Sequence, residues 1–305
     1  MMPSLVPGEV GVLAAESLSD LADRALGGAP IATYVEGNPM PWSVIADGGW
    51  DTIGIPEGDG GGGATLLDLA TAARAWGQTC IPLPFVVSTM AKRWSVQARQ
   101  LDGPVSIAVP QAGASTAGAG EAGASDVSGR APFGGEPGVV VLRGLSEGGE
   151  APAELVDASI DDFAPSLRLA QTSWSSTMDP AARLELGIVW AAEATGCGQR
   201  LLDLSVGYAK ERQQFGRPIG SFQAIKHRLA DMRVSTEAAE TAVIWAAVSP
   251  DEGARAARYA LDESIRVAES AIQVHGGMGF TWELGLHYYL RHVVTLRELV
   301  HGLWR

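Results

Sequence analysis

The sequence predicts a mainly α-helical protein in which a small β region separates two helical parts. Apolar residues recur at helical spacing through the first hundred residues and again from Pro180 to the C-terminus. Between these parts lie short β-type runs around a stretch rich in Gly, Ala and Ser. We therefore expect a shortened N-terminal helical domain over residues 1–102, a reduced β-domain with a Gly/Ala-rich insert over 103–178, and a C-terminal four-helix bundle over 179–305.

Composition limits the class of protein. Of the 305 residues, 46% are hydrophobic and 19% are charged, which is enough for a large core and too apolar for general disorder. The formal net charge of -13 disfavours nucleic acid as a partner, because binding phosphates needs a positive surface. The first residues lack the pattern of an export signal, and charges interrupt every long apolar run. We expect a cytoplasmic protein with no membrane partner.

Two helical patterns define the N-terminal part. One apolar face is formed by Leu13, Leu18 and Leu26, and a second runs from Leu66 to Ala73. Between them the chain reaches four consecutive glycines at 60–63. That segment is predicted to be a loop, because glycine at such density costs too much backbone entropy to hold in a helix.

The middle part indicates short strands around a mobile insert. Residues 105–109 and 139–142 are rich in β-branched side chains, and they bracket the Gly/Ala/Ser-rich stretch at 112–138. Weak alternation at 167–170 is compatible with one or two more strands. The pair Asp179-Pro180 then predicts the start of a helix.

Long helices are predicted from Pro180 onward. Three apolar stripes cover 184–209, 222–248 and 254–274. Three or four long antiparallel helices in one bundle are the simplest packing.

The first segment of chemical interest is YAKERQQFGRPIGSFQAIKHRLADM at 208–232. Arg212 and Phe215 are three residues apart, so on a helix they would share a face and could meet one ligand. A guanidinium suits a pyrophosphate because its fork donates two parallel hydrogen bonds. A solvated Arg beside a core Phe is the alternative, and spacing alone leaves both open.

The second segment is AIQVHGGMGF at 271–280, where a helix pattern runs into glycines. Missing side chains let a backbone approach a ligand closely. The alternative is an ordinary helix C-cap and turn, which glycine spacing alone favours.

The remaining reactive side chains have structural explanations at this stage. His and Tyr cluster at 282–301, and such residues are more often half-buried on a helix face than catalytic. Cys80 and Cys197 lie far apart without metal-ligand spacing, so we expect reduced core thiols and no metal site.

Together the two long segments and Arg291 of LHYYLRH resemble the acyl-CoA dehydrogenase family. The resemblance is strong from Pro180 to Val300, moderate from Trp42 to Phe85 and weak between. The shortened N-terminal and middle parts make the chain similar to the shorter subunit of heteromeric actinobacterial acyl-CoA dehydrogenases of steroid breakdown.

The resemblance implies FAD as cofactor and a set of residues that touch it. Arg212 and Phe215 match the family's RxxFG pattern, which reaches the FAD of a neighbouring subunit. The family's contacts to the adenosine and pyrophosphate end fall on Gln223, Gln273, Gly276 and Gly277. The implied reaction is α,β-dehydrogenation of an acyl-CoA thioester, in which a carboxylate removes the α-proton and a hydride leaves for the flavin. An electron acceptor flavoprotein is the implied oxidant.

The family's catalytic carboxylate is missing from the matching positions. Its two known locations fall on Val300 and Leu186, and no strand matches the Trp-containing one that covers the flavin ring. Glu185 and Glu298 are weak candidates, because a shift of one residue turns a helical side chain by about 100°.

These gaps predict a heteromer. A second, longer acyl-CoA dehydrogenase subunit would supply the base, in an α2β2 heterotetramer that acts on a ring-bearing acyl-CoA. Two alternatives remain at this stage: a structural subunit without flavin contact, and an independent homo-oligomeric dehydrogenase that uses Glu185 or Glu298.

Overall fold

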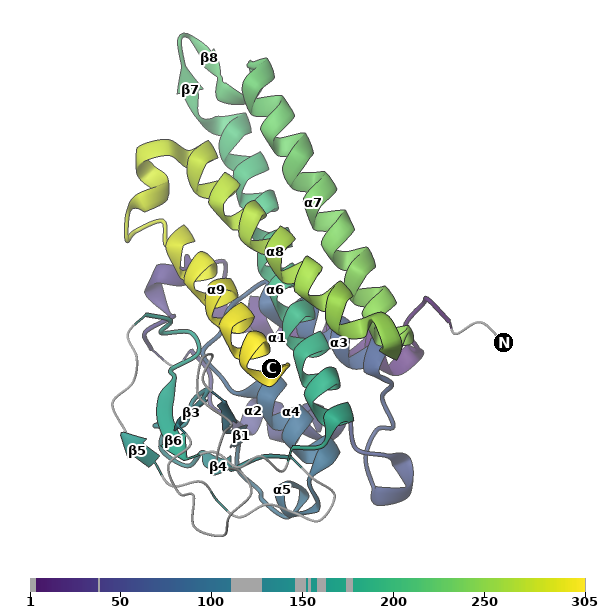
Figure 1. The fold of residues 1–305 in the computed structure, drawn as a ribbon. Coiled ribbons are helices and arrows are strands. Elements are labelled where there is room, and N and C mark those ends of the chain that lie inside the picture. Colours follow the sequence, from purple (N-terminus) through teal and green to yellow (C-terminus); the bar gives the residue numbers. More distant parts are fainter. Residues whose placement is uncertain are drawn as a thin grey trace.

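The structure is a computed structural model that describes residues 4–37, 39–110, 128–145, 152, 155–157, 163–173 and 178–304. A long helical bundle rises from a base of shorter helices and strands (Figure 1). This confirms the predicted mainly α fold with a small β region. The first part of the predicted insert, residues 112–127, lies outside the described residues.

The N-terminal part consists of five α-helices and short 3-10 turns among the described residues. The helices are α1 (Glu9–Leu26), α2 (Ser43–Asp47), α3 (Leu66–Gly77), α4 (Phe85–Trp94) and α5 (Val96–Arg99). The glycine-rich segment before α3 forms the predicted loop, with only the 3-10 turns η2 (Trp50–Thr52) and η3 (Glu57–Asp59) in it. Thr65 and Asp68 then cap α3 reciprocally, which fixes where this helix begins.

The β region contains two small sheets. A parallel pair joins β1 (Val105–Ile107) to β4 (Val140–Leu142). A four-stranded antiparallel sheet has the order β2-β3-β6-β5, from the strands β2 (Val109–Pro110), β3 (Ser128–Ala131), β6 (Ala170–Ser173) and β5 (Leu155–Asp157). The predicted strands at 105–109 and 139–142 are thus confirmed, and the alternation at 167–170 marks the approach to β6.

The C-terminal bundle contains α6 (Pro180–Glu211), α7 (Gln223–Val248), α8 (Pro250–His275) and α9 (Leu286–Leu303). As predicted, Pro180 is the first residue of α6, and the Asp179 carboxylate accepts a hydrogen bond from the Ala181 N–H at 2.7 Å. At the far end of the bundle, a hairpin of β7 (Gln213–Gln214) and β8 (Arg217–Pro218) joins α6 to α7 and projects beyond α8 (Figure 1).

Two glycines bring the N-terminal helices against the bundle. A Cβ added to Gly77 of α3 would lie 2.0 Å from the Glu193 carbonyl oxygen, and one added to Gly196 of α6 would lie 2.0 Å from that of Arg74. The α3 and α6 backbones therefore touch where only glycine fits. One hydrophobic core continues from α1 through the β region into α9, so the division into three domains remains a prediction.

No helix within the described ranges combines the length and apolar character needed to cross a membrane.

Candidate functional site

The free end of the bundle holds the first predicted segment. Helix α6 stops at Glu211, because Arg212 has an extended backbone (φ -67, ψ 120) and the hairpin follows at once. Arg212 and Phe215 therefore do not share a helix face, and that prediction is wrong. The sequence reason is Gly216 and Pro218, which favour a turn and end the helical path. Both side chains nevertheless line one hollow.

Phe215 has an unusual position in the turn. Gln214 pairs with Arg217, so Phe215 and Gly216 form a two-residue hairpin loop with φ values of 53 and 77. Such turns favour Asn or Gly at both positions, since a left-handed backbone strains other residues. Phe215 is also 90% exposed. The fold of this chain alone gives no reason for a strained, solvent-exposed aromatic ring here.

The hollow has a volume of about 340 Å³ and lies between the hairpin and the end of α8. It has a mainly apolar wall with one guanidinium, and its lining includes Tyr208, Arg212, Phe215, Phe222, His275 and Gly276. Tyr208 of α6 stacks on His275 of α8, with ring centroids 4.3 Å apart. Phe222 meets Phe215 edge to face and lies under the Arg217 guanidinium, 4.3 Å from its ring centroid. Four aromatic rings and the Arg212 guanidinium thus line one space.

His275 is fixed as a wall of this hollow. Its Nδ1–H donates to the Ala271 carbonyl at 2.8 Å. Burial lowers the pKa of the imidazole below its usual value, and that hydrogen bond opposes the shift only in part. A neutral ring stacked on Tyr208 follows. Sequence reasoning did not assign Tyr208 or His275 to the site, although both lie inside the quoted segments.

The three glycines after α8 have different roles. Gly276 has a φ of 61, and a Cβ on Gly279 would lie 2.5 Å from the Ile272 carbonyl oxygen. Local backbone geometry therefore explains both. Gly277 is exposed, has no positive φ and has open space where a side chain would go. Its missing side chain leaves the backbone accessible from outside.

The two predicted glutamines lie beside the hollow rather than in its wall. Gln223 is the first residue of α7, next to Phe222, and Gln273 is on the last turn of α8. Both are exposed. Of the six predicted cofactor residues, the structure brings Arg212, Phe215 and Gly276 together in the hollow.

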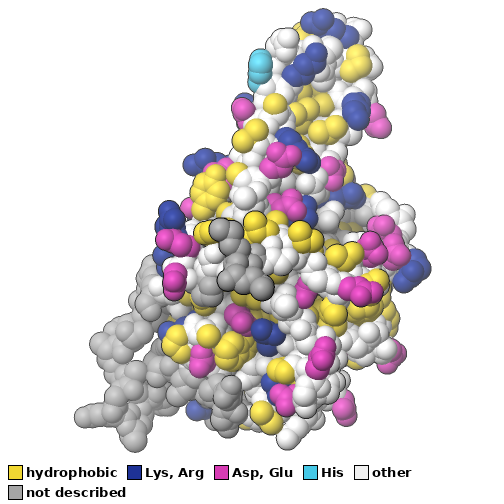
Figure 2. All heavy atoms as spheres, turned by 90° about the vertical axis from the view of Figure 1, so that its right-hand side faces the viewer, with side chains coloured by type: hydrophobic (Ala, Val, Ile, Leu, Met, Phe, Trp, Pro, Cys, Tyr) yellow, Lys and Arg dark blue, Asp and Glu magenta, His cyan; other side chains and the backbone are white. Residues whose placement is uncertain are grey.

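This end of the molecule is basic in an acidic protein. Residues 208–228 contain five Lys and Arg against one Glu, while the whole chain carries -13. Basic side chains surround apolar ones around the tip in Figure 2. The guanidinium of Arg212 has neither an ion pair nor a hydrogen bond within the described part of the chain. A local positive field of this kind attracts an anion.

The two candidate bases lie elsewhere. Both oxygens of Glu185 accept hydrogen bonds from Arg93, at 2.7 and 3.3 Å, and one also accepts from the Trp94 indole at 2.8 Å. Glu298 is exposed on α9, beside Arg297 at 3.6 Å. Neither lines the hollow at the tip, and the two family positions, Leu186 and Val300, are fully buried.

A second hollow of about 530 Å³ lies where α9 meets the β region. Arg291 lines it, with its guanidinium 5.3 Å from the Trp282 ring centroid. Tyr288 donates to Glu36 at 2.9 Å; burial and that hydrogen bond raise the pKa of Tyr288 to about 12. Glu36 comes from the N-terminal part, and no motif pointed to it.

Comparison with known proteins defines the class first. The profile of the acyl-CoA dehydrogenase C-terminal domain matches residues 186–299. Acyl-CoA dehydrogenase IpdE2 of Mycobacterium tuberculosis is 31% identical over 268 residues, which cover 86% of this chain and 82% of the relative. IpdE2 of Mycolicibacterium smegmatis is 30% identical over 278 residues, covering 86% and 84%. The chain therefore belongs to the acyl-CoA dehydrogenase family and is an oxidoreductase of that family.

Solved structures share the fold. The ChsE4-ChsE5 complex from Mycobacterium tuberculosis superposes with a TM-score of 0.70 at 19% identity, over 99% of this chain and 96% of that one. PigA with FAD and proline gives 0.71 at 16% identity, over 97% and 94%. At these identities the likeness concerns the fold alone.

Proposed function

We propose that this chain is a subunit of an FAD-dependent acyl-CoA dehydrogenase that introduces an α,β double bond into an acyl-CoA thioester. In this proposal the tip of the bundle holds the adenosine and pyrophosphate end of an FAD at a subunit interface. The catalytic base and most of the acyl pocket come from a longer partner subunit, in an α2β2 assembly.

One observation carries the proposal: the tip presents groups that the fold of this chain does not need. Phe215 is strained and exposed, the Arg212 guanidinium has no partner in the described chain, and Gly277 lacks a side chain without internal cause. Strain of this kind persists where function uses it. A ligand or a second subunit that covers the tip accounts for all three.

The residues fit FAD by their chemistry. Arg212 would donate paired hydrogen bonds to phosphate oxygens, and Gly277 would let the backbone approach the same group. Phe215 would cover a flat ring of the nucleotide or of the facing subunit, and Gln223 and Gln273 would supply amide contacts. Bound FAD supplies the hydride acceptor, and electrons then leave to an electron acceptor flavoprotein.

The catalytic base is assigned to a partner subunit because of how Glu185 and Glu298 are placed in this chain. The carboxylate of Glu185 ties α6 to α4 through Arg93 and Trp94, and a carboxylate that accepts three hydrogen bonds is poorly placed to take a substrate proton. Glu298 is an exposed residue on α9. We extend the proposal to a bulky, ring-bearing acyl-CoA, in line with the resemblance to steroid-catabolic members.

The test is co-expression with a longer acyl-CoA dehydrogenase that retains the family's glutamate. We expect a yellow complex that dehydrogenates an acyl-CoA, and a chain that holds no FAD and has no turnover when expressed alone. Turnover by the isolated chain would favour the independent enzyme. An active complex in which changes at the tip leave FAD occupancy unaltered would favour the purely structural subunit.

A further inference from the structure

A buried polar cluster lies where α3, α6 and α9 meet. The sulfur atoms of Cys80 and Cys197 are 3.4 Å apart, although 117 positions separate them in the chain. The imidazole of His292 lies beside them, and one donor atom from each residue falls within 4.8 Å of the others. All three side chains are at most 2% exposed. The proposed dehydrogenase site uses none of them.

The backbone contact described above creates this cluster. Gly77 and Gly196 let α3 approach α6, and Cys80 and Cys197 follow those glycines by three residues and one. Cys80 adopts a φ of 48 at the turn after α3. A left-handed backbone on a residue other than glycine is costly and tends to persist at functional positions.

Each ring nitrogen of His292 has a hydrogen-bond partner. Its Nε2 lies 3.1 Å from a carboxylate oxygen of Glu193, and its Nδ1 lies 2.8 Å from the Ser166 hydroxyl. A carboxylate on one ring nitrogen orients the ring and leaves the other nitrogen for a metal. Ser166 is then the group that an ion would displace or bind beside.

The distances suit a tetrahedral ion. Zinc bonds of about 2.3 Å to sulfur and about 2.0 Å to nitrogen place ligand atoms roughly 3.5–3.8 Å apart. The two sulfur atoms already lie close to this separation, at 3.4 Å. A movement of the imidazole by about 1 Å would complete three ligand positions of the tetrahedron.

Charge favours a divalent, thiophilic cation. Two thiolates would neutralise a divalent cation, so the ion and its sulfur ligands together would carry no net charge.

A hollow lies next to the residues that lead into the cluster. A hollow of about 240 Å³ is lined by Tyr34, Gln78, Thr79, Arg200 and Tyr289. Two of these residues immediately precede Cys80, and the tyrosine hydroxyls donate to the carbonyls of Thr79 and Gln78.

We infer that Cys80, Cys197 and His292 form a structural binding site for a thiophilic divalent cation, best matched by Zn²⁺. The ion replaces two thiol protons, which leave to solvent, and no electron is transferred. It joins the N-terminal part to α6 and α9 of the bundle. This role is separate from the proposed flavin site at the tip.

The test uses the full chain, alone and with its partner, purified without a metal-affinity step. Elemental analysis is expected to find about one zinc per chain, and a chelator should lower the Tm. Replacing the zinc with Co²⁺ should give a thiolate-to-cobalt charge-transfer band in the near ultraviolet, which reports sulfur ligands without any substitution.

Two histidine substitutions on α9 serve as the test and its control. H292Q should reduce zinc content at least tenfold, while H287Q, which changes a histidine outside the cluster, should retain it. A chain without stoichiometric metal, with a Tm that Zn²⁺ does not change and no cobalt–thiolate band, would overturn the inference. So would a native mass lower by two hydrogens, because the sulfur atoms would then form a disulfide.

Discussion

Replacing Phe215 with Asn should separate the stability of this chain from the function of its tip. A left-handed backbone costs an ordinary residue roughly 1–2 kcal/mol, whereas Asn adopts it readily. Phe215 is 90% exposed, so removing its ring forfeits little burial. The main loss is the edge contact with Phe222 at 6.0 Å, worth about 0.5–1.5 kcal/mol.

These contributions nearly cancel in the isolated chain. We expect F215N to change the free energy of unfolding by less than about 1 kcal/mol, and most simply to increase it slightly. A buried Phe would instead cost about 3–5 kcal/mol on truncation. In the complex the ring becomes buried, so its loss should weaken FAD binding or assembly by about 1.5–3 kcal/mol, or roughly ten- to a hundredfold.

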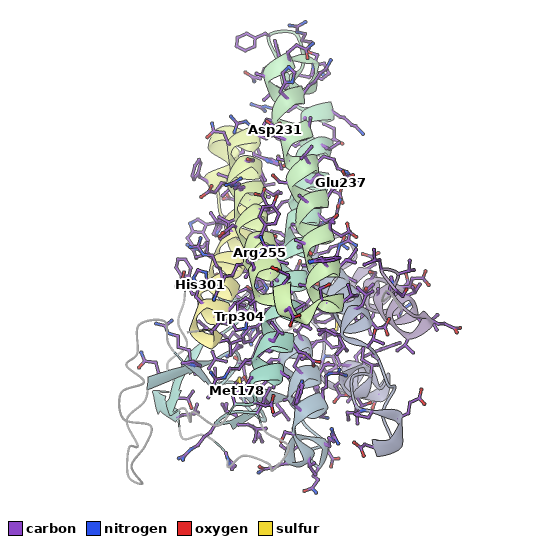
Figure 3. All side chains as sticks on the ribbon, turned by 45° about the vertical axis from the view of Figure 1, so that its right-hand side comes forward. Met178, Asp231, Glu237, Arg255, His301 and Trp304 are labelled. Carbon is purple, nitrogen blue, oxygen red and sulfur yellow. The ribbon has the colours of Figure 1, made fainter. Side chains whose placement is uncertain are left out.

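Urea unfolding of the isolated chain and FAD titration of the apo-complex would measure the two effects. The control is R255A, which removes an exposed side chain near the opposite end of the bundle from the tip (Figure 3). Destabilisation of the isolated chain by more than about 2 kcal/mol would show that Phe215 supports the fold itself. Unchanged FAD binding and assembly would refute its role at an interface.

Three further outcomes follow from the geometry. G277A should leave the Tm almost unchanged but weaken FAD binding. G279A should destabilise the chain by about 1–3 kcal/mol, because its methyl group would crowd the end of α8. Equal losses of Tm in the two variants would contradict this. E185Q should destabilise the chain by about 1–3 kcal/mol, because it removes the ion pair with Arg93, yet leave kcat of the assembled enzyme unchanged. Loss of turnover in a folded E185Q protein would restore Glu185 as the candidate base. The lowered pKa of His275 means that the folded chain resists its protonation. Stability from this group is therefore full above pH 6.5 and declines as pH falls toward the folded pKa; H275N should flatten that decline in thermal melts, and an unchanged slope would exclude His275 as its source.

The periodic parts of the fold could be predicted from the sequence. Apolar stripes and Asp179-Pro180 predicted α6, and the glycine run predicted the loop before α3. The end of α6 near 209 and the start of the next helix near 222 also follow from the sequence, but placing Arg212 and Phe215 on one helix face was wrong, because the chain leaves the helix before Arg212. The hollow at the tip depends on how α6 and α8 face each other, so the stacking of Tyr208 on His275 has no local sequence signal.

The contact between Cys80 and Cys197 across the core could not be predicted from the sequence either. Cys80 and Cys197 meet because Gly77 and Gly196 permit two helix backbones to touch. A glycine inside a helix has several explanations, and only the crossing of α3 and α6 selects one. The lack of the family's carboxylate, by contrast, was predicted by counting along the sequence, from Arg291 to Val300 and back from Gly198 to Leu186, and it stays a prediction.

The most direct test of the account is FAD affinity in the complex with and without the Arg212 guanidinium. A charged hydrogen bond to phosphate is worth about 1.5–3 kcal/mol, so R212A should raise the Kd for FAD roughly ten- to a hundredfold while R255A leaves it unchanged. Equal FAD affinities in R212A and the wild-type complex would contradict the claim that this end of the bundle holds the nucleotide.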